Sequence, residues 1–138
     1  MVLALVAVLA GIALPRYARS VARYQADATA RRICADLTLA QSRARLTSST
    51  ITVTFTPASN QYSIPGMPDP NVRASSSCTI NLSAQPYPTK LVSANFAGGT
   101  SLSFDGYGSP SSGGTVVVQS GDTTRTITIN ADTGTAGY

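Results

Sequence analysis

The apolar segment Met1–Leu14 constrains this chain more than any other feature. It carries no polar side chain and ends at Pro15, which is followed by Arg16 and Tyr17. As a helix it would reach about 21 Å, whereas the hydrocarbon core of a bilayer is about 30 Å thick. Such a segment is the apolar region of a signal peptide, a buried core helix, or the distal part of a membrane anchor.

We favour the membrane anchor. A signal peptide has a basic segment before its apolar region, and a core helix has a polar face, but neither feature accompanies this segment. We expect the first residues of the anchor and a short basic leader to precede Met1. The residues expected to lie in the membrane, and later in the core of an assembly, are Met1, Val2, Leu3, Leu5, Val6, Val8, Leu9, Ile12, Leu14 and Pro15.

The arginines after this segment bear on which side of the membrane the rest of the chain lies. Basic residues beside a membrane segment usually stay in the cytoplasm, which would place residues 16–138 there. Ser and Thr supply about a quarter of the chain, however, and that composition suits an exported domain. A basic leader before Met1 would remove this conflict. Arg16, Arg19 and Arg23 share a helix face where they could bind lipid headgroups; the alternative is that they only solubilise an exposed helix.

The helical pattern continues through residues 15–50. Pro15 lacks a backbone hydrogen-bond donor, so we expect the helix to bend or loosen there. Beyond it, small or aliphatic residues recur every three or four positions and form one apolar stripe: Ala22, Ala26, Ala30, Ile33, Leu37, Ala40 and Ala44. We therefore expect residues 1–50 to form the N-terminal helix, with 1–14 as its membrane part and 15–50 as its amphipathic part.

From Ile51 the apolar period changes to two. Ile51, Val53 and Phe55 alternate with threonines, as in a half-buried strand. Further strands are predicted at 62–64, 78–82, 90–96, 101–104, 115–119 and 124–130, the last two as a hairpin. The sequence thus predicts an α+β fold. The second half of a long N-terminal helix packs on an antiparallel sheet in a β-rich head, residues 51–138.

Composition excludes most kinds of catalysis. The chain has no His, no Trp and no Glu, and its six acidic residues are all Asp. A Ser-His-Asp triad, a His-ligated metal and a Glu-based acid/base pair are therefore impossible. Asn130, Asp132 and Gly134 match part of a calcium loop, but the other EF-hand ligands are absent and a turn is the better interpretation. We expect no enzyme activity, no catalytic residue, no cofactor and no metal site.

The net charge of +4 is unevenly distributed. Residues 1–50 hold seven of the ten basic side chains and two Asp, whereas residues 51–138 hold three basic side chains and four Asp. A nucleic-acid-binding domain would concentrate its basic groups on the folded head. Because the head is nearly neutral, nucleic acid is the less favoured partner.

Two cysteines, Cys34 and Cys78, raise the question of a disulfide. An even number of cysteines in an exported chain favours one bond between them. The alternative is two independent buried thiols, which behave as small apolar side chains. The sequence does not decide between the two.

Several segments resemble a known family. Gly11–Tyr17 (GIALPRY) is similar to the N-terminal helix of type IV pilins and type II secretion pseudopilins, which share an apolar segment, a helix-loosening Pro and a following aromatic residue. Asp36–Ala44 (DLTLAQSRA), Phe104–Pro110 (FDGYGSP), the C-terminal hairpin and Asp132–Gly134 resemble the GspH/FimT subgroup of minor pilins and minor pseudopilins. The resemblance spans the chain.

The resemblance implies a structural subunit of a type II secretion pseudopilus or a type IV pilus. Such a subunit is made as a prepilin and crosses the bacterial inner membrane once, with its head in the periplasm. It then packs with other pilin or pseudopilin subunits in a filament, and secretion substrates are further partners. Family members open, after their leader, with apolar residues that include a Glu. No such opening is printed here, so leader cleavage and N-methylation are assigned to no residue.

Two other functions are also considered. Some FimT-like minor pilins bind DNA in natural transformation through an Arg-bearing motif near the C-terminus. The matching tail, Gly134–Tyr138, has no Arg, and the nearest is Arg125, so phosphate contacts would be few. The other alternative is a secreted β-domain released from a signal peptide, which predicts a soluble product that begins beyond residue 14.

Overall fold

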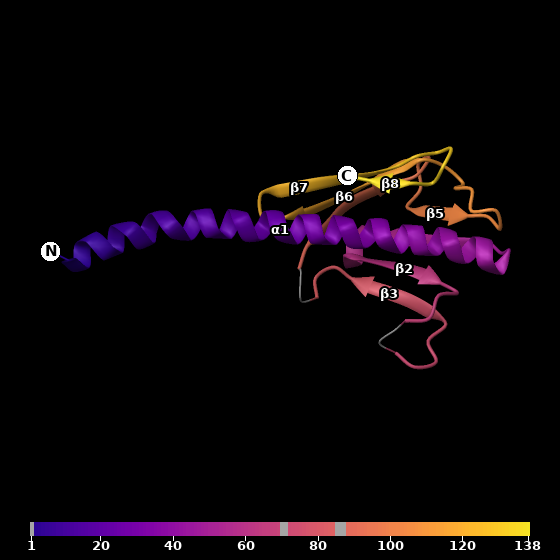
Figure 1. The fold of residues 1–138 in the computed structure, drawn as a ribbon, viewed down its shortest axis with the longest axis horizontal. Coiled ribbons are helices and arrows are strands. Elements are labelled where there is room, and N and C mark those ends of the chain that lie inside the picture. The colour runs from indigo at the N-terminus through magenta and orange to yellow at the C-terminus, as the bar shows by residue number, and fades with distance from the viewer. Residues whose placement is uncertain (1, 70–71, 85–87) are drawn as a thin grey trace.

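The computed structural model describes residues 2–69, 72–84 and 88–138, with side chains except at 12–14. Met1 and the side chains of Ile12 and Leu14, which belong to the predicted membrane segment, lie outside that description. One long helix, α1 (Val2–Thr47), precedes a β-rich head (Figure 1). The head contains the short 3-10 helix η1 (Pro57–Ser59). Its strands are β1 (Ile51–Thr56), β2 (Gln61–Pro65), β3 (Ser77–Asn81), β4 (Lys90–Asn95), β5 (Ser101–Phe104), β6 (Gly114–Ser120), β7 (Thr123–Ile129) and β8 (Ala136–Gly137).

α1 runs through Pro15 without interruption and curves gently towards its N-terminus (Figure 1). It ends in a Schellman motif: Ser48 has a left-handed φ of 48°, and the N–H of Ser49 donates to the carbonyl of Ala44 at 3.2 Å. The chain then turns directly into β1, which begins at Ile51. The helix therefore ends at Thr47, and the strands of the head begin at Ile51.

The predicted apolar stripe is the face of α1 that packs on the head. Ala26, Ala30, Ile33, Leu37, Ala40 and Ala44 are buried, and Ala22 is half-buried. Because most of these side chains are small, the helix backbone lies close to the strands beneath it. Residues of α1 contact β6, β7 and β8 on one side and β1 and β5 on the other.

The head has two four-stranded antiparallel sheets where we expected one. Their strand orders are β3-β2-β1-β5 and β4-β6-β7-β8. β4 and β5 are consecutive in the chain but belong to different sheets. The tight turn Phe96–Gly99 between them has positive φ at Ala97 and Gly98. β5 pairs with β1 instead, from Ile51↔Phe104 to Thr54↔Ser101. Residue alternation predicts the two faces of a strand but not its neighbours, so the sequence did not reveal this division.

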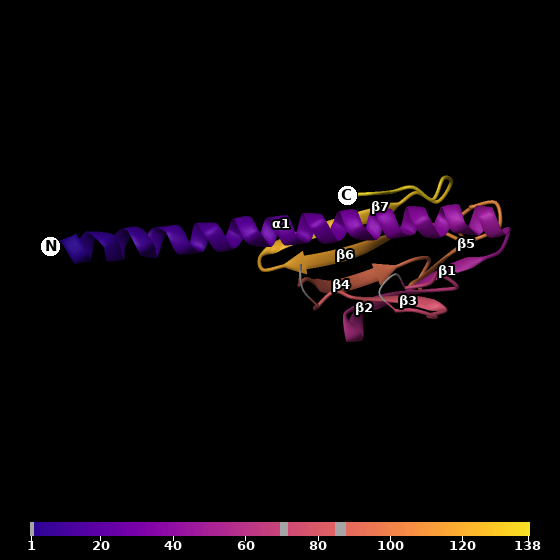
Figure 2. The same ribbon diagram turned by 60° about the horizontal axis from the view of Figure 1, so that its bottom comes forward.

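The core lies between the two sheets and the second half of α1. Phe55 of β1 packs on Tyr62 of β2 with ring centroids 5.4 Å apart, and on Phe96, beside the other sheet, at 5.6 Å. α1 extends beyond the head at its N-terminal end (Figure 2), where the described side chains before Val21 are all exposed. The fold therefore separates a helix section built into the head from a section that projects from it.

Candidate interaction surfaces

The projecting section of α1 begins with an apolar stretch whose described side chains, at residues 2–11, are all exposed. Its exposed large side chains are Val2, Leu3, Leu5, Val6, Val8 and Leu9. We call residues 2–14 the apolar shaft. The shaft is part of α1, which is the one helix among the described residues that is long and apolar enough to cross a membrane, a criterion that a signal sequence would also meet. A helix without a polar face is stable where lipid or other helices surround it.

The structure places Pro15, Arg16, Arg19 and Arg23 immediately after the shaft. All four residues are exposed, and the three arginines follow one face of α1 at helical spacing. Neither of the two ion pairs found among the described residues involves them. The structure thus brings these cations together at the point where the shaft ends and the head begins to cover α1.

Polar contacts fix α1 where it enters the head. The hydroxyl of Ser120 donates to Oε1 of Gln25 at 2.8 Å, and Nε of Arg125 donates to Oδ1 of Asp27 at 2.5 Å. Ser120 ends β6 and Arg125 lies on β7, so both contacts come from the C-terminal hairpin. The nearest arginine to the tail is therefore engaged in an ion pair.

A buried glutamine anchors two loops to the distal half of α1. Nε2 of Gln41 donates to the carbonyl of Gly108 at 2.7 Å and to that of Thr133 at 2.8 Å. Gly134 lies so close to Gln41 that a Cβ on it would be 2.8 Å from Nε2 of Gln41. Its φ of +72° also favours glycine at this position. Sequence analysis missed Gln41. A polar residue beside the apolar stripe position Ala40 was the available signal.

Another polar contact lies between α1 and β2. The hydroxyl of Tyr62 donates to Oδ2 of Asp36, and Nε of Arg32 lies 3.9 Å from the same oxygen. Burial raises the pKa of the Asp36 carboxyl, an effect that the Tyr62 hydrogen bond and the Arg32 charge oppose. Burial, and secondly the Asp36 charge, also raise the pKa of Tyr62. Tyr62 therefore remains a hydrogen-bond donor at physiological pH.

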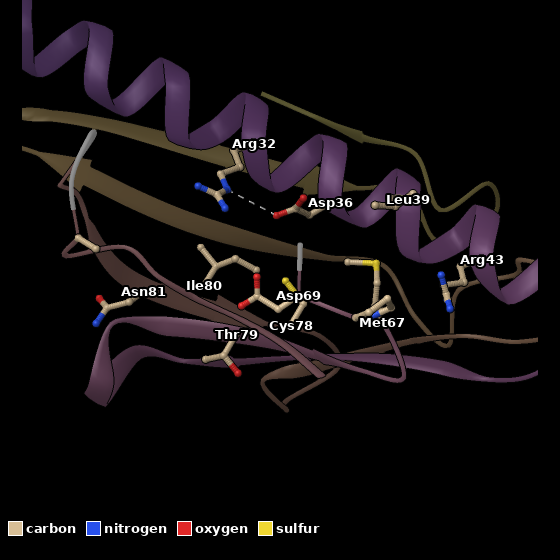
Figure 3. Close-up of a pocket in the computed structure, with 12 residues that line it drawn as sticks. Arg32, Asp36, Leu39, Arg43, Met67, Asp69, Cys78, Thr79, Ile80 and Asn81 are labelled. Atoms are coloured by element: carbon tan, nitrogen blue, oxygen red, sulfur yellow. Dashed lines mark ion pairs between the residues drawn. The ribbon is translucent and has the colours of Figure 1, made fainter. Parts of the chain in front are cut away.

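A groove of about 540 Å³ separates α1 from β3 (Figure 3). We call it the α1–β3 groove. One wall is a single helix face, and the other is the outer strand of the first sheet with the segment before it. The helix wall consists of Arg32, Asp36, Leu39 and Arg43, and the other wall includes Met67, Asp69, Cys78, Thr79, Ile80 and Asn81. Sequence analysis did not bring these segments together.

Cys34 and Cys78 are both free thiols in the structure, so the bond between them that we weighed is not formed. Cys34 is half-buried on α1, and Cys78 is buried on β3. Burial raises the pKa of both thiols. Protonated thiols are weak nucleophiles, so neither residue is in an activated state.

The segment that matched part of a calcium loop is a turn in the structure. Oδ1 of Asn130 accepts hydrogen bonds from the backbone N–H of Asp132 at 2.8 Å and of Thr133 at 3.3 Å. This is an Asx turn, in which the amide oxygen serves the local backbone. Among the residues that the structure describes, no group of three His, Cys, Asp or Glu side chains could hold a metal.

Comparison with known proteins gives one match. A family model described as type II transport protein GspH matches residues 29–134, which is more than half of the chain. The matched range covers α1 from Thr29 and the head as far as Gly134, and it leaves out β8 and the apolar shaft. No curated protein and no solved structure matches the chain.

Proposed function

The chain belongs to the GspH family of type II transport proteins, and on this premise we propose that it is a minor, non-enzymatic subunit of a type II secretion pseudopilus. The observation that carries the proposal is the apolar shaft, which continues as one helix into the core of the head. Such a subunit assembles through the shaft and presents the head at the surface of the filament.

The apolar shaft is suited to two successive environments, lipid before assembly and neighbouring helices after it. Before assembly it lies in the inner membrane as a single span, where each exposed Leu or Val favours lipid. After assembly it packs against the equivalent helices of other pseudopilins, which shield the same side chains. A heterologous contact that does not close on itself extends as a helical filament. Arg16, Arg19 and Arg23 lie at the lipid headgroups in the first state, with the head in the periplasm.

The head supports a structural role. Its contacts with α1 combine a buried apolar stripe with the Gln25–Ser120 and Asp27–Arg125 pairs. These contacts transmit a displacement of the helix to the head, as a filament that grows by adding subunits requires. The exposed strands and loops are then free to contact neighbouring subunits and secretion substrates.

Secretion in the native host tests this proposal. Val6→Asp places a charge in the middle of the shaft, where a membrane helix loses about 3 kcal/mol per charged residue. We expect the variant to lose membrane retention and secretion of substrate. Thr126→Asp introduces the same charge on the exposed face of β7 and is the matched control, expected to behave as the wild type.

Two outcomes would contradict the proposal. One is full secretion by Val6→Asp at wild-type abundance. The other is a functional soluble product that lacks residues 1–14, which would favour the secreted β-domain.

A further inference from the structure

The segment of α1 that follows the apolar shaft carries three positive charges and no acid. Arg16, Arg19 and Arg23 lie on one helix face, span about 10 Å along the helix axis, and are all exposed. We call these three residues the basic collar. The first acidic residue in the chain is Asp27, whose carboxylate accepts a hydrogen bond from Arg125. The charge of the collar is therefore not balanced within its own segment of the helix.

The described part of the chain supplies no ion pair to the collar. The two ion pairs found there join Arg32 to Asp36 and Arg125 to Asp27. Like charges at helical spacing repel one another, so an anion beside the collar is favourable. Arginine is well suited to such an anion, because its guanidinium can donate two parallel hydrogen bonds to a phosphate or a carboxylate.

The position of the collar selects the phosphate groups of a lipid bilayer. In a helix along the bilayer normal with Leu14 at the edge of the hydrocarbon core, Arg16 and Arg19 lie about 3 and 8 Å above that edge. The headgroup layer there is about 5–8 Å thick. Arg23 lies about 6 Å further out. Helical side chains point towards the N-terminus, which is here the direction of the bilayer, so the long side chain of Arg23 reaches back towards the same layer.

An exposed aromatic residue lies at the same level of α1. Tyr17 directly follows Arg16, and its side chain is 73% exposed. Tyrosine is enriched where a membrane meets water, because its ring favours the apolar side and its hydroxyl the wet side. Arg16 and Tyr17 thus place the same point of the helix at the bilayer surface through two independent preferences. A carboxylate on another protein would account for the arginines but not for the tyrosine.

We propose that the basic collar binds anionic phospholipids and prefers them to zwitterionic ones. The guanidinium groups donate to the phosphate oxygens, and the net negative charge of the headgroup balances the collar. A zwitterionic headgroup carries its own cation and supplies no such balance. A second copy of this chain is a poor partner for the collar, because residues 1–26 contain no acid. The inference rests on the proposed placement of the shaft in a membrane and adds the class of lipid that is selected there.

Native mass spectrometry of the full chain tests the inference. The chain is released from nanodiscs made of equal parts phosphatidylglycerol and phosphatidylcholine, and the lipids that stay bound to it are identified. We expect the wild type to retain phosphatidylglycerol over phosphatidylcholine by at least about fivefold, the ratio expected from one basic residue at an anionic membrane surface. The variant that combines Arg16→Gln, Arg19→Gln and Arg23→Gln should retain the two lipids about equally.

The matched control removes the same charge from exposed positions beyond the collar. It combines Arg32→Gln, Arg45→Gln and Arg73→Gln, and it should keep the preference of the wild type. Circular dichroism checks that each variant is folded.

Incorporation into the nanodiscs reports on the shaft, so the two proposals fail separately. Equal retention of both lipids by the incorporated wild type would overturn the inference alone and leave an acidic protein as the partner of the collar. A preference that survives in the collar variant, or is lost in the control, would also overturn it, because another part of the chain would then select the lipid. A chain that does not enter the nanodiscs would contradict the proposed function as well.

Discussion

Nε of Arg125 lies 2.5 Å from Oδ1 of Asp27, and this ion pair joins β7 to α1 where the helix leaves the head. The neighbouring hydrogen bond from Ser120 to Gln25 supports the same junction at 2.8 Å. The two contacts set the direction in which the apolar shaft projects. In the proposed function, this junction makes the helix and the head move as one body.

We expect the Asp27–Arg125 pair to contribute modestly to stability. Its two side chains are about a third exposed, so Arg125→Gln should lower the free energy of unfolding by about 0.5–1 kcal/mol. Chemical denaturation of the full chain in detergent measures the change. High salt should shrink the difference from the wild type, because screening weakens exposed pairs. A difference that does not respond to salt would show that the guanidinium acts by packing alone.

Gln41→Ala should destabilise the head more strongly. It removes two hydrogen bonds and leaves the carbonyls of Gly108 and Thr133 without their donor, at a cost of about 2 kcal/mol or more. Gln119→Ala is the control, since Gln119 makes one exposed hydrogen bond to the carbonyl of Gly121. Equal changes in Tm for the two variants would contradict the anchoring role of Gln41.

Gly134→Ala tests the backbone conformation beside Gln41. The residue has φ +72°, and an added Cβ would lie 2.8 Å from Nε2 of Gln41 and 3.0 Å from the ring of Phe104. We expect a loss of about 1–3 kcal/mol. Gly137→Ala adds the same methyl group in open space without a positive φ, so its Tm should stay close to that of the wild type.

The buried Asp36 predicts a specific pH dependence. Its folded-state pKa is raised above 3.8, so between the two values the folded protein binds more protons than the unfolded chain. The contribution of Asp36 to stability therefore falls as pH rises through this window. Asp36→Asn keeps an oxygen that can accept from Tyr62 but does not ionise.

We accordingly expect the stability of Asp36→Asn relative to the wild type to increase between about pH 3 and pH 7. Thermal unfolding across this range measures it, with the exposed turn variant Asp122→Asn as control. A constant difference between Asp36→Asn and the wild type would mean that burial does not penalise the charged carboxylate.

Local patterns in the sequence predicted the elements of the fold well. The alanine-rich stripe predicted the buried face of α1, and the alternation from Ile51 predicted β1. The assignment of β5 to the sheet of β1 was not predictable, because pairing depends on contacts between distant residues. The division of the head into two sheets was therefore not predicted.

The contacts that define the surfaces were harder to predict. Gln41 donates to two backbone carbonyls, 67 and 92 positions further along the chain. Every residue has a backbone carbonyl, so the residue types in the sequence give no sign of these contacts. Arg43 looks in the sequence like any solvated helix arginine. In the structure its Nε is buried, and Arg43 lines the α1–β3 groove together with residues of β3 and the segment before it. The exposure of the apolar shaft, by contrast, follows directly from its lack of polar residues.

Photocrosslinking from the shaft tests the central claim most directly. A photoreactive amino acid replaces Val6 in the full chain, which is then expressed in the native host with its secretion system. The account predicts adducts between this position and another pseudopilin subunit, formed only when secretion is active. A protein that secretes normally but gives no protein adduct from position 6, while the same group at Thr126 does crosslink, would contradict assembly through the shaft.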